Sequence, residues 1–408
     1  MPTQRTATVI ALCAFAVPVR ADVTVWQKGD SYLDLNMLVQ VQGRYVWASG
    51  AGTTPDGATV FFRRLRPAIS GAIDRNWYGI IEVDFGPGFE GEDPKTSVEH
   101  AFLEYSGFED NQQSALKIGS IDPAFGREFL TSGAKLLTLE QTFNGIHWYG
   151  TPDMTMGTGF TFTSCDRKLS AQVVVGMMSI KQEPDRIWFQ SPQNQTDNSD
   201  NTGYLASGRV DFWPIGKMPV DARHPATLAF DPNDLHRTDG WHVLASIGGY
   251  GWWNNNANNP AAMACPTTND NVCPNGLANV HWTYGGELSA ELLGYGFTAD
   301  VEYQRIQSAL EDRTFDGGLY FNGAAGLNKL VASAGYMVYA DILELVGNFS
   351  LLTATNFPSS WYSSRLGLNW FIREHTIQLS AEGTYNENAF GTTGAHEELV
   401  RIQAQLAW

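Results

Sequence analysis

An alternation of apolar and polar side chains with a period of two residues recurs along this chain, and it restricts the possible folds more than any other feature. Its clearest copy is the C-terminal segment. The apolar positions there are Val400, Ile402, Ala404, Leu406 and Trp408, and the polar positions are Arg401, Gln403 and Gln405. Because successive side chains of a strand point to opposite faces, this segment predicts a strand with one apolar face and one polar face.

The same alternation predicts strands along most of the chain. Further copies occur at residues 35–47, 64–73, 77–85, 103–105, 209–212, 365–370 and 377–382. Helical periodicity is scarce, and after the N-terminal region no run of 18 apolar residues occurs, which argues against a helical membrane protein. A soluble β-sandwich would alternate similarly. An aromatic residue at the very end of the last strand instead favours a transmembrane antiparallel β-barrel, with lipid outside and water inside.

The strand number and the outer loops follow from length and polarity. The 387 residues after position 21 suit about 16 strands of roughly 9 to 11 residues with connections, and 14 or 18 strands fit nearly as well. Long polar segments at 185–202, 222–239 and 254–279 are the candidate extracellular loops. Six tryptophans near presumed strand ends suggest aromatic girdles at the two membrane interfaces. They are Trp47, Trp77, Trp213, Trp252, Trp253 and Trp361.

The N-terminus reads as an export signal. Arg5 supplies a positive region, residues 7–17 form a short apolar core, and Ala21 offers a small residue for cleavage. We therefore expect a signal peptide at residues 1–21 and one barrel domain at 22–408, located in the outer membrane of a Gram-negative cell. The core is too short to span a bilayer as a helix.

The mature chain is strongly acidic. Loss of residues 1–21 removes Arg5 and Arg20 from 26 basic residues and nothing from 43 acids, so 24 bases face 43 acids and the net charge is −19. This balance argues against nucleic acid as a partner. Acidic loop segments at 90–93 and 197–200 could bind calcium, but solvated loop charge is the simpler interpretation.

The cysteines suggest one surface disulfide. Cys265 and Cys273 lie in a polar, turn-rich stretch, where a bond closing a loop suits an oxidising compartment. Cys165 is then left over, and we expect it to be a small buried side chain. No CxxC pair or neighbouring histidine accompanies it, so zinc is not expected there.

Two segments resemble a known family. FFRRLRPAISGAIDRNWYGIIEVDFG (Phe61–Gly86) is similar to the second and third strands of the phosphate-selective porin O/P family of Gram-negative outer membranes. EHAFLEYSGFEDNQQSALKIGSIDPAFGREFLTSGAKLLTLEQ (Glu99–Gln141) resembles that family's fourth and fifth strands and the loop that then folds inward. Its markers are AFLEY, KIGSIDPAFG and the spacing of Thr131, Ser132, Lys135 and Glu140.

This resemblance implies a 16-stranded barrel, a homotrimer and a narrow pore lined by basic side chains, with a constriction loop folded into the lumen. Carried over by position, Arg44 matches a basic residue of the first strand, Arg63 and Arg64 match a double arginine of the second, and Lys135 matches a lysine of the constriction loop. The alternation adds Arg66 and Arg209 to the lumen side. By the pleat, however, Arg63 should point outward, so a β-bulge or a position at the constriction above the membrane is required.

Basic side chains at such positions suggest passage of small anions. Fixed guanidinium groups replace part of the hydration that an anion loses in a narrow pore. Alternatively, the arginines pair with Glu82, Asp84, Glu104 or Asp211 and only stiffen the barrel. Because the chain lacks a broad lysine surplus, strict phosphate selectivity is not indicated, and a pore for organic anions such as dicarboxylates or a non-selective pore fits equally.

Other functions have less support. The sequence contains no GxSxG, HExxH or phosphate-binding glycine loop, and its eight histidines are scattered, so we do not expect an enzyme or a cofactor. An outer-membrane hydrolase and a plugged structural barrel remain the alternatives to a porin.

Overall fold

A computed structural model describes residues 23–50, 56–86, 96–109, 113–144, 148–183, 186–190, 202–218, 240–254 and 280–408. Nearly all regular structure in them is β. The strands are β1 (Val23–Lys28), β2 (Ser31–Ser49), β3 (Gly57–Ala72), β4 (Trp77–Asp84), β5 (Ser97–Tyr105), β6 (Ser114–Ile121), β7 (Thr155–Thr163), β8 (Leu169–Glu183), β9 (Arg186–Gln190), β10 (Thr202–Ile215), β11 (His242–Asn254), β12 (Val280–Gly294), β13 (Phe297–Leu310), β14 (Ala324–Tyr339), β15 (Leu343–Ala354), β16 (Trp361–Arg373), β17 (Ile377–Glu387) and β18 (His396–Ala407).

Three short helical turns complete the described elements: α1 (Arg127–Leu130), η1 (Thr142–Asn144) and η4 (Ala389–Gly391). No helix in these residues is long and apolar enough to cross a membrane.

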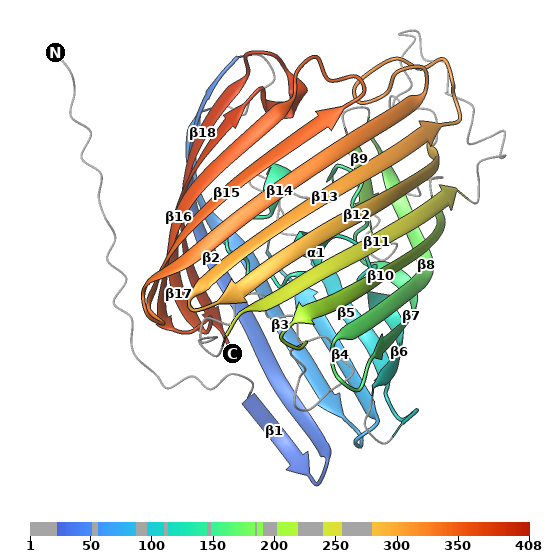
Figure 1. Ribbon diagram of the computed structural model, residues 1–408, viewed down its shortest axis with the longest axis vertical. Coiled ribbons are helices and arrows are strands. Elements are labelled where there is room, and N and C mark those ends of the chain that lie inside the picture. Colours follow the sequence, from blue (N-terminus) through green and yellow to red (C-terminus); the bar gives the residue numbers. More distant parts are fainter. Residues whose placement is uncertain are drawn as a thin grey trace.

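The strands form a closed antiparallel barrel of 16 strands within the described residues (Figure 1). Consecutive strands pair as hairpins, β8 pairs with β10, and β18 pairs with β2 to close the cylinder. Two further strands lie outside this ring: β1 folds back on the start of β2, and β9 pairs with the last residues of β8. The predicted fold class and strand number are therefore confirmed.

One end of the barrel carries the short turns. Tyr295 and Gly296 alone join β12 to β13, both with positive φ, as a two-residue hairpin turn requires. Trp408 pairs with Met37 at this same end. The end of β10 also lies here, because Met218 donates a backbone hydrogen bond to Arg167 in the β7–β8 turn.

The three predicted outer loops lie largely outside the described residues. Residues 222–239 lie wholly outside them. Of 185–202, only β9 and Thr202, the first residue of β10, are described, and of 254–279 only Asn254, the last residue of β11.

The alternation marks the outer and inner faces as predicted. On β18, Val400 and Ile402 are 42% and 62% exposed, whereas Arg401, Gln403 and Gln405 are buried inside the barrel. The outward apolar side chains are exposed because they form the surface that lipid covers.

The tryptophan prediction is half wrong. Trp47, Trp77 and Trp253 face outward as girdle residues would, but Trp213, Trp252 and Trp361 are buried on the inner face. Trp252 donates its indole N–H to the carbonyl of Met178, and Trp361 packs against Phe143 at a ring distance of 5.1 Å. These two inward rings belong to an apolar cluster inside the barrel, which a strictly polar lumen did not anticipate.

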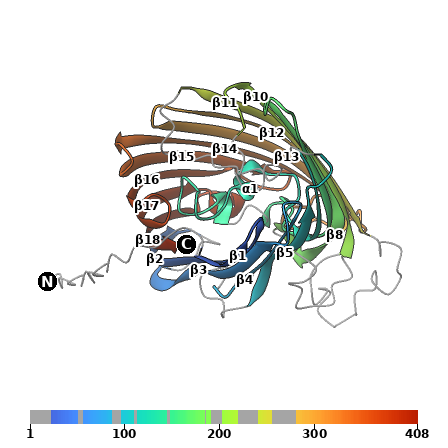
Figure 2. The same cartoon turned by 90° about the horizontal axis from the view of Figure 1, so that it is seen from below.

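Between β6 and β7 the chain folds into the barrel, as the resemblance implied. We call residues 122–154 the inner loop; residues 145–147 of it lie outside the described part. Figure 2 shows α1, which belongs to this loop, inside the ring of strands. Aromatic residues of the loop fix it in place, with Phe125 packed edge-on against Tyr250 of β11 at 4.7 Å.

Candidate pore constriction

The first part of the inner loop is anchored to the wall formed by β10, β12 and β13. Glu287 accepts a hydrogen bond from the backbone N–H of Gly126, and Glu302 accepts one from Glu128 N at 2.9 Å. Arg127 forms a buried ion pair with Glu291. Carboxylates of the wall thus satisfy the first free N–H groups of α1, and their negative charge suits the N-terminal end of a helical turn.

The second part of the loop, residues 133–141, crosses to the opposite wall. Backbone carbonyls of the loop accept hydrogen bonds from Gln40 of β2, Arg365 and Asn369 of β16, and Gln405 of β18. Glu382 of β17 accepts one from Leu139 N at 3.1 Å. Because both walls hold it through polar contacts, the loop divides the lumen at a fixed position.

Arg63 reaches the lumen through a β-bulge. The pairing of β2 with β3 shifts between Gln40, which faces Arg64, and Val41, which faces Phe62, so Arg63 is the extra residue. Below the bulge Leu65 and Ile69 point outward, and above it Val60 and Phe62 do. An extra residue reverses the pleat, which allows two consecutive arginines to face the same side.

Arg63 forms a two-pronged ion pair with Glu140 of the inner loop. Its Nε and Nη2 atoms donate to the two carboxylate oxygens at 2.6 and 2.8 Å, and Gln42 donates to the same carboxylate at 3.0 Å. Burial alone would raise the pKa of Glu140, but the charges of Arg63 and Arg64 outweigh it and lower the pKa to about 2. Glu140 therefore stays ionised over the whole working pH range.

Arg64 lies beneath the inner loop and is only 4% exposed. Its Nη1 donates to Gln40 at 2.6 Å, and its guanidinium packs directly under Gly133. A Cβ atom on Gly133 would lie 2.6 Å from the guanidinium carbon, so glycine is what lets the loop come this close. In this position Arg64 supports the loop from below.

Arg66 and Arg209 are engaged by carboxylates. Arg66 contacts Asp84 at 2.6 Å, Glu99 at 3.3 Å and Glu82 at 3.7 Å, and these acids lie on β4 and β5. Arg209 of β10 pairs with Asp211 at 2.8 Å and with Glu287 of β12. Both arginines are thus paired with acids, which was the predicted alternative to contact with a passing anion.

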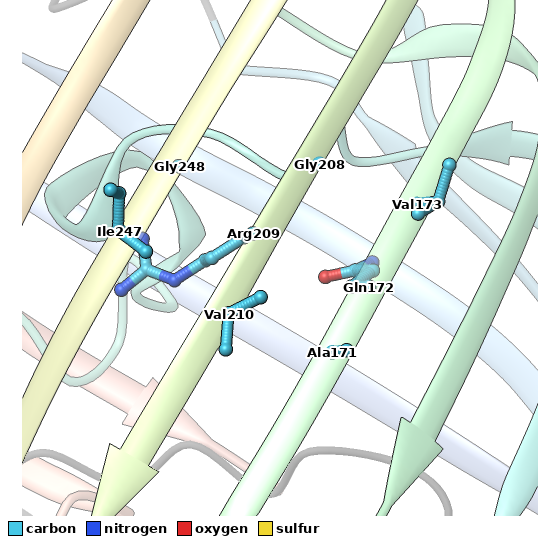
Figure 3. A pocket seen from close by; sticks show the side chains of 8 residues that line it. All are labelled: Ala171, Gln172, Val173, Gly208, Arg209, Val210, Ile247 and Gly248. Carbon is cyan, nitrogen blue, oxygen red and sulfur yellow. The ribbon is translucent and has the colours of Figure 1, made fainter.

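The Arg209–Glu287 pair crosses an entire intervening strand. Gly248 of β11 lies directly between them in the strand register. Figure 3 shows the Arg209 side chain running towards Gly248, among the residues that line a hollow in this wall. A Cβ on Gly248 would meet the Glu287 carboxylate at 2.8 Å, so the missing side chain makes room for the pair.

Arg44 and Lys135 are half-buried. Arg44 faces inward on β2 directly opposite Arg401 of β18. Lys135 belongs to the inner loop, where its backbone N–H closes a turn on Ser132 at 2.8 Å.

The sequence interpretation missed two arginines at this wall. Arg401 pairs with Glu382 at 3.1 Å, and Arg365 donates to the backbone carbonyls of Glu140 and Gln141. The alternation alone placed both on the polar face. Together with Arg44, Arg63 and Arg64 they form what we call the arginine wall, on β2, β3, β16 and β18.

Two carboxyls of the inner loop have raised pKa values. Burial raises the pKa of Glu128 to about 7, and the charge of Glu302 adds to this while hydrogen bonds from Thr142 oppose it. Burial likewise raises the pKa of Asp153 to about 7, with a contribution from Glu99. Both groups change charge near neutral pH.

The remaining predicted sites are settled only in part. Cys165 is exposed in the β7–β8 turn, where it contacts Gln113 at 3.4 Å, so the prediction of a buried side chain is wrong. The turn projects beyond the barrel wall, so the side chain of Cys165 has no neighbouring strand to cover it. Cys265, Cys273, residues 1–21 and the acidic segments 90–93 and 197–200 lie outside the described residues. Within the described part, no three His, Cys, Asp or Glu residues are arranged to hold a metal ion.

Part of the chain matches a known protein family. Residues 36–223 match the family model described as phosphate-selective porin O and P. The resemblance to this porin family is confirmed. The matched region contains the bulge, the inner loop and most of the arginines discussed above. A search of curated proteins finds no match.

Solved structures show the same fold. The outer membrane channel DcaP of Acinetobacter baumannii is similar with a TM-score of 0.57 and 11% identity, over 95% of this chain and 100% of that one. An anion-selective porin from Comamonas acidovorans gives 0.56 and 10%, over 93% and 100%. OmpT of Vibrio cholerae gives 0.54 and 10%, over 94% and 99%. At these identities the solved structures show that the fold is shared.

Proposed function

We propose that this protein is an outer-membrane porin whose water-filled channel lets small solutes diffuse passively and favours small anions, such as phosphate or organic anions. The observation that carries the proposal is the arginine wall beside the inner loop. The charges of Arg63 and Arg401 are neutralised there by Glu140 and Glu382, whereas Arg365 donates its hydrogen bonds to neutral carbonyl groups. We infer an excess of positive charge on this side of the lumen.

The chemistry of this wall suits anions. A guanidinium carries five donors in a fixed plane and remains charged at any working pH, so it can replace water around a carboxylate or phosphate. The ion pairs and hydrogen bonds hold these side chains before the solute arrives, which lowers the cost of ordering them. Arg44 and Arg63 are only partly buried, and we propose them together with Lys135 as the cations that a passing solute meets. The charges of the neighbouring Arg64 and Arg66 contribute to the electrostatic potential that the solute meets.

A non-selective porin is the second candidate. It is favoured by the acids elsewhere in the lumen. Arg66 of β3 is surrounded by Glu82, Asp84 and Glu99 of β4 and β5, and Arg209 of β10 is paired with two further acids. A lumen with one basic and one acidic side would pass ions of both signs. The two candidates differ in the sign and size of the reversal potential.

We also propose that the barrel works as a homotrimer. One of the similar structures, OmpT of Vibrio cholerae, has been solved in a trimer form, at 11% identity and a TM-score of 0.52. We further propose that residues 1–21 are a cleaved export signal, on the sequence pattern given above.

The test is conductance in a planar bilayer under a potassium chloride gradient. We expect steady, ohmic conductance and a reversal potential that shows anion preference. The double variant Arg44→Gln with Lys135→Gln should lose most of that preference, while Arg373→Gln, an exposed cation at the end of β16, should retain it. Absence of conductance would overturn the channel, and equal permeability of both ions in the native protein would favour the non-selective candidate.

A further inference from the structure

An arginine faces outward from the wall of the barrel, where lipid is expected. Arg305 lies on β13, five residues before its end, and it is exposed. Its neighbours Glu302, Gln304 and Ile306 are buried on the inner side, whereas Val301 and Tyr303 point outward with it. Among the strand side chains that the structure describes, Arg305 is the one cation that points outward more than two residues from a strand end.

The height of Arg305 can be read from the aromatic residues around it. The lower girdle of this face is formed by Trp241, Tyr295 and Phe297, whose rings contact one another. The upper girdle contains Trp282 and Tyr284, stacked at 5.1 Å, and Tyr284 pairs with Gln307.

The separation of the two girdles matches a membrane. From Phe297 to Gln307 the strand rises by about 33 Å, or roughly 25 Å along the membrane normal for a tilt near 40°, which is the height of the apolar band of such barrels. Arg305 precedes Gln307 by two residues and therefore lies about 5 Å below the upper girdle. This is the level at which lipid headgroups meet the acyl chains.

The surroundings of Arg305 are polar but neutral. Asn328, its direct neighbour on β14, accepts a hydrogen bond from Tyr303 at 2.9 Å and donates one to Thr353 of β15 at 3.2 Å. On the other side its neighbour is Gly286, and a Cβ there would meet nothing within 4 Å. Within the described residues no side chain accepts a hydrogen bond from Arg305. Its donors are thus open towards the membrane.

We propose that Arg305, with the amide and hydroxyl groups of Asn328, Tyr303 and Thr353, is a binding site for the phosphate of an anionic lipid in the leaflet at the loop end of the barrel. A charged side chain on the lipid face is unfavourable unless it is near the interface or paired. A phosphate at headgroup level supplies the missing negative charge and accepts several N–H donors in one plane. The long arginine side chain can also extend upwards to reach it.

The test is retention of phosphatidic acid by the purified barrel, measured by native mass spectrometry, with phosphatidylcholine as the neutral comparison lipid. Loss of a charge-assisted hydrogen bond corresponds to about a tenfold weaker affinity. Arg305→Gln should therefore lower phosphatidic acid retention by about tenfold, and Arg305→Lys should lower it less. The matched control Arg373→Gln removes a cation at the opposite end of the barrel and should change nothing. Heat-modifiable migration in gels verifies that every variant is folded.

A photoreactive residue at position 286 separates lipid from protein as the occupant. Cross-linking to lipid in native membranes supports the site. Cross-linking to a second copy of the chain would overturn it, because Arg305 would then lie in a subunit interface. Equal retention of phosphatidic acid by the native protein and folded Arg305→Gln would overturn it as well. None of these outcomes depends on whether the channel prefers anions.

Discussion

Glu140 offers the sharpest test of how the inner loop sets the charge of the pore. Its carboxylate neutralises Arg63 through two short hydrogen bonds, and its low pKa keeps it ionised. The change Glu140→Gln removes one negative charge but keeps the shape of the side chain. The loop should stay in place, because Leu139, Glu140 and Gln141 are also held through backbone atoms by Glu382 and Arg365.

The size of the effect follows from Coulomb's law. An ion that passes roughly 7 Å from the altered charge in water changes its energy by about 0.6 kcal/mol, close to the thermal energy. Because anions gain and cations lose this amount, the ratio of anion to cation permeability should rise by about sevenfold at low salt. At 0.1 M salt the Debye length is about 10 Å, and screening reduces the rise to about threefold.

The assay is the reversal potential under a salt gradient, recorded at low and high ionic strength. The matched control is Glu398→Gln, which removes the same charge from an exposed, outward position on β18 and should leave selectivity unchanged. A folded, conducting Glu140→Gln channel with native selectivity would refute the idea that Arg63 and Glu140 act on the permeating ion. An equal rise in the control would show that the effect is not local.

Three further outcomes follow from the geometry. Glu128 and Asp153 have pKa values raised to about 7, so each gains a negative charge as pH rises through 7; anion preference should fall by about twofold, and Glu128→Gln should weaken this pH dependence in bilayer recordings. Gly133→Val should displace the inner loop, because even a Cβ would clash with Arg64, and single-channel conductance should change while Ser132→Val, at an exposed position, leaves it nearly native. Gly248→Ala should break the Arg209–Glu287 pair and lower the free energy of unfolding in urea by about 1 to 3 kcal/mol, whereas Gly286→Ala, which meets no neighbour, should be nearly neutral.

The barrel itself could be predicted from the sequence because its walls obey a simple rule. Lipid on one side and a polar interior on the other impose a period of two, and the burial of β18 follows that period from Glu397 to Gln405. The inner loop and the bulge at Arg63 were also within reach, the first through the family resemblance and the second because a double arginine conflicts with a regular pleat.

The interior of the lumen was less accessible to sequence reasoning. Residue type predicts girdle positions for Trp252 and Trp361, but their positions in the strand register turn them inward. Trp361 packs on Phe143 and Trp252 donates to Met178. The partners of the loop are distant in the sequence, from 77 residues for Arg63 with Glu140 to 271 for Ala134 with Gln405. No local pattern encodes such pairs, and only the closed register of the barrel brings them together.

The distribution of charge, rather than its total, decides whether an acidic chain can favour anions. A net charge of −17 over the whole chain would by itself oppose anion passage. However, a charge outside the lumen or beyond about 10 Å is largely screened, so an ion in the constriction responds mainly to the side chains that border it. Acids such as Glu82, Asp84 and Glu99 surround Arg66 on β3, β4 and β5, whereas Arg365 of β16 contacts the loop carbonyls. The position of the inner loop sets whether a solute passes closer to the acids around Arg66 or to the arginines beside the loop. We therefore expect the position of the loop to determine selectivity more strongly than the composition of the chain.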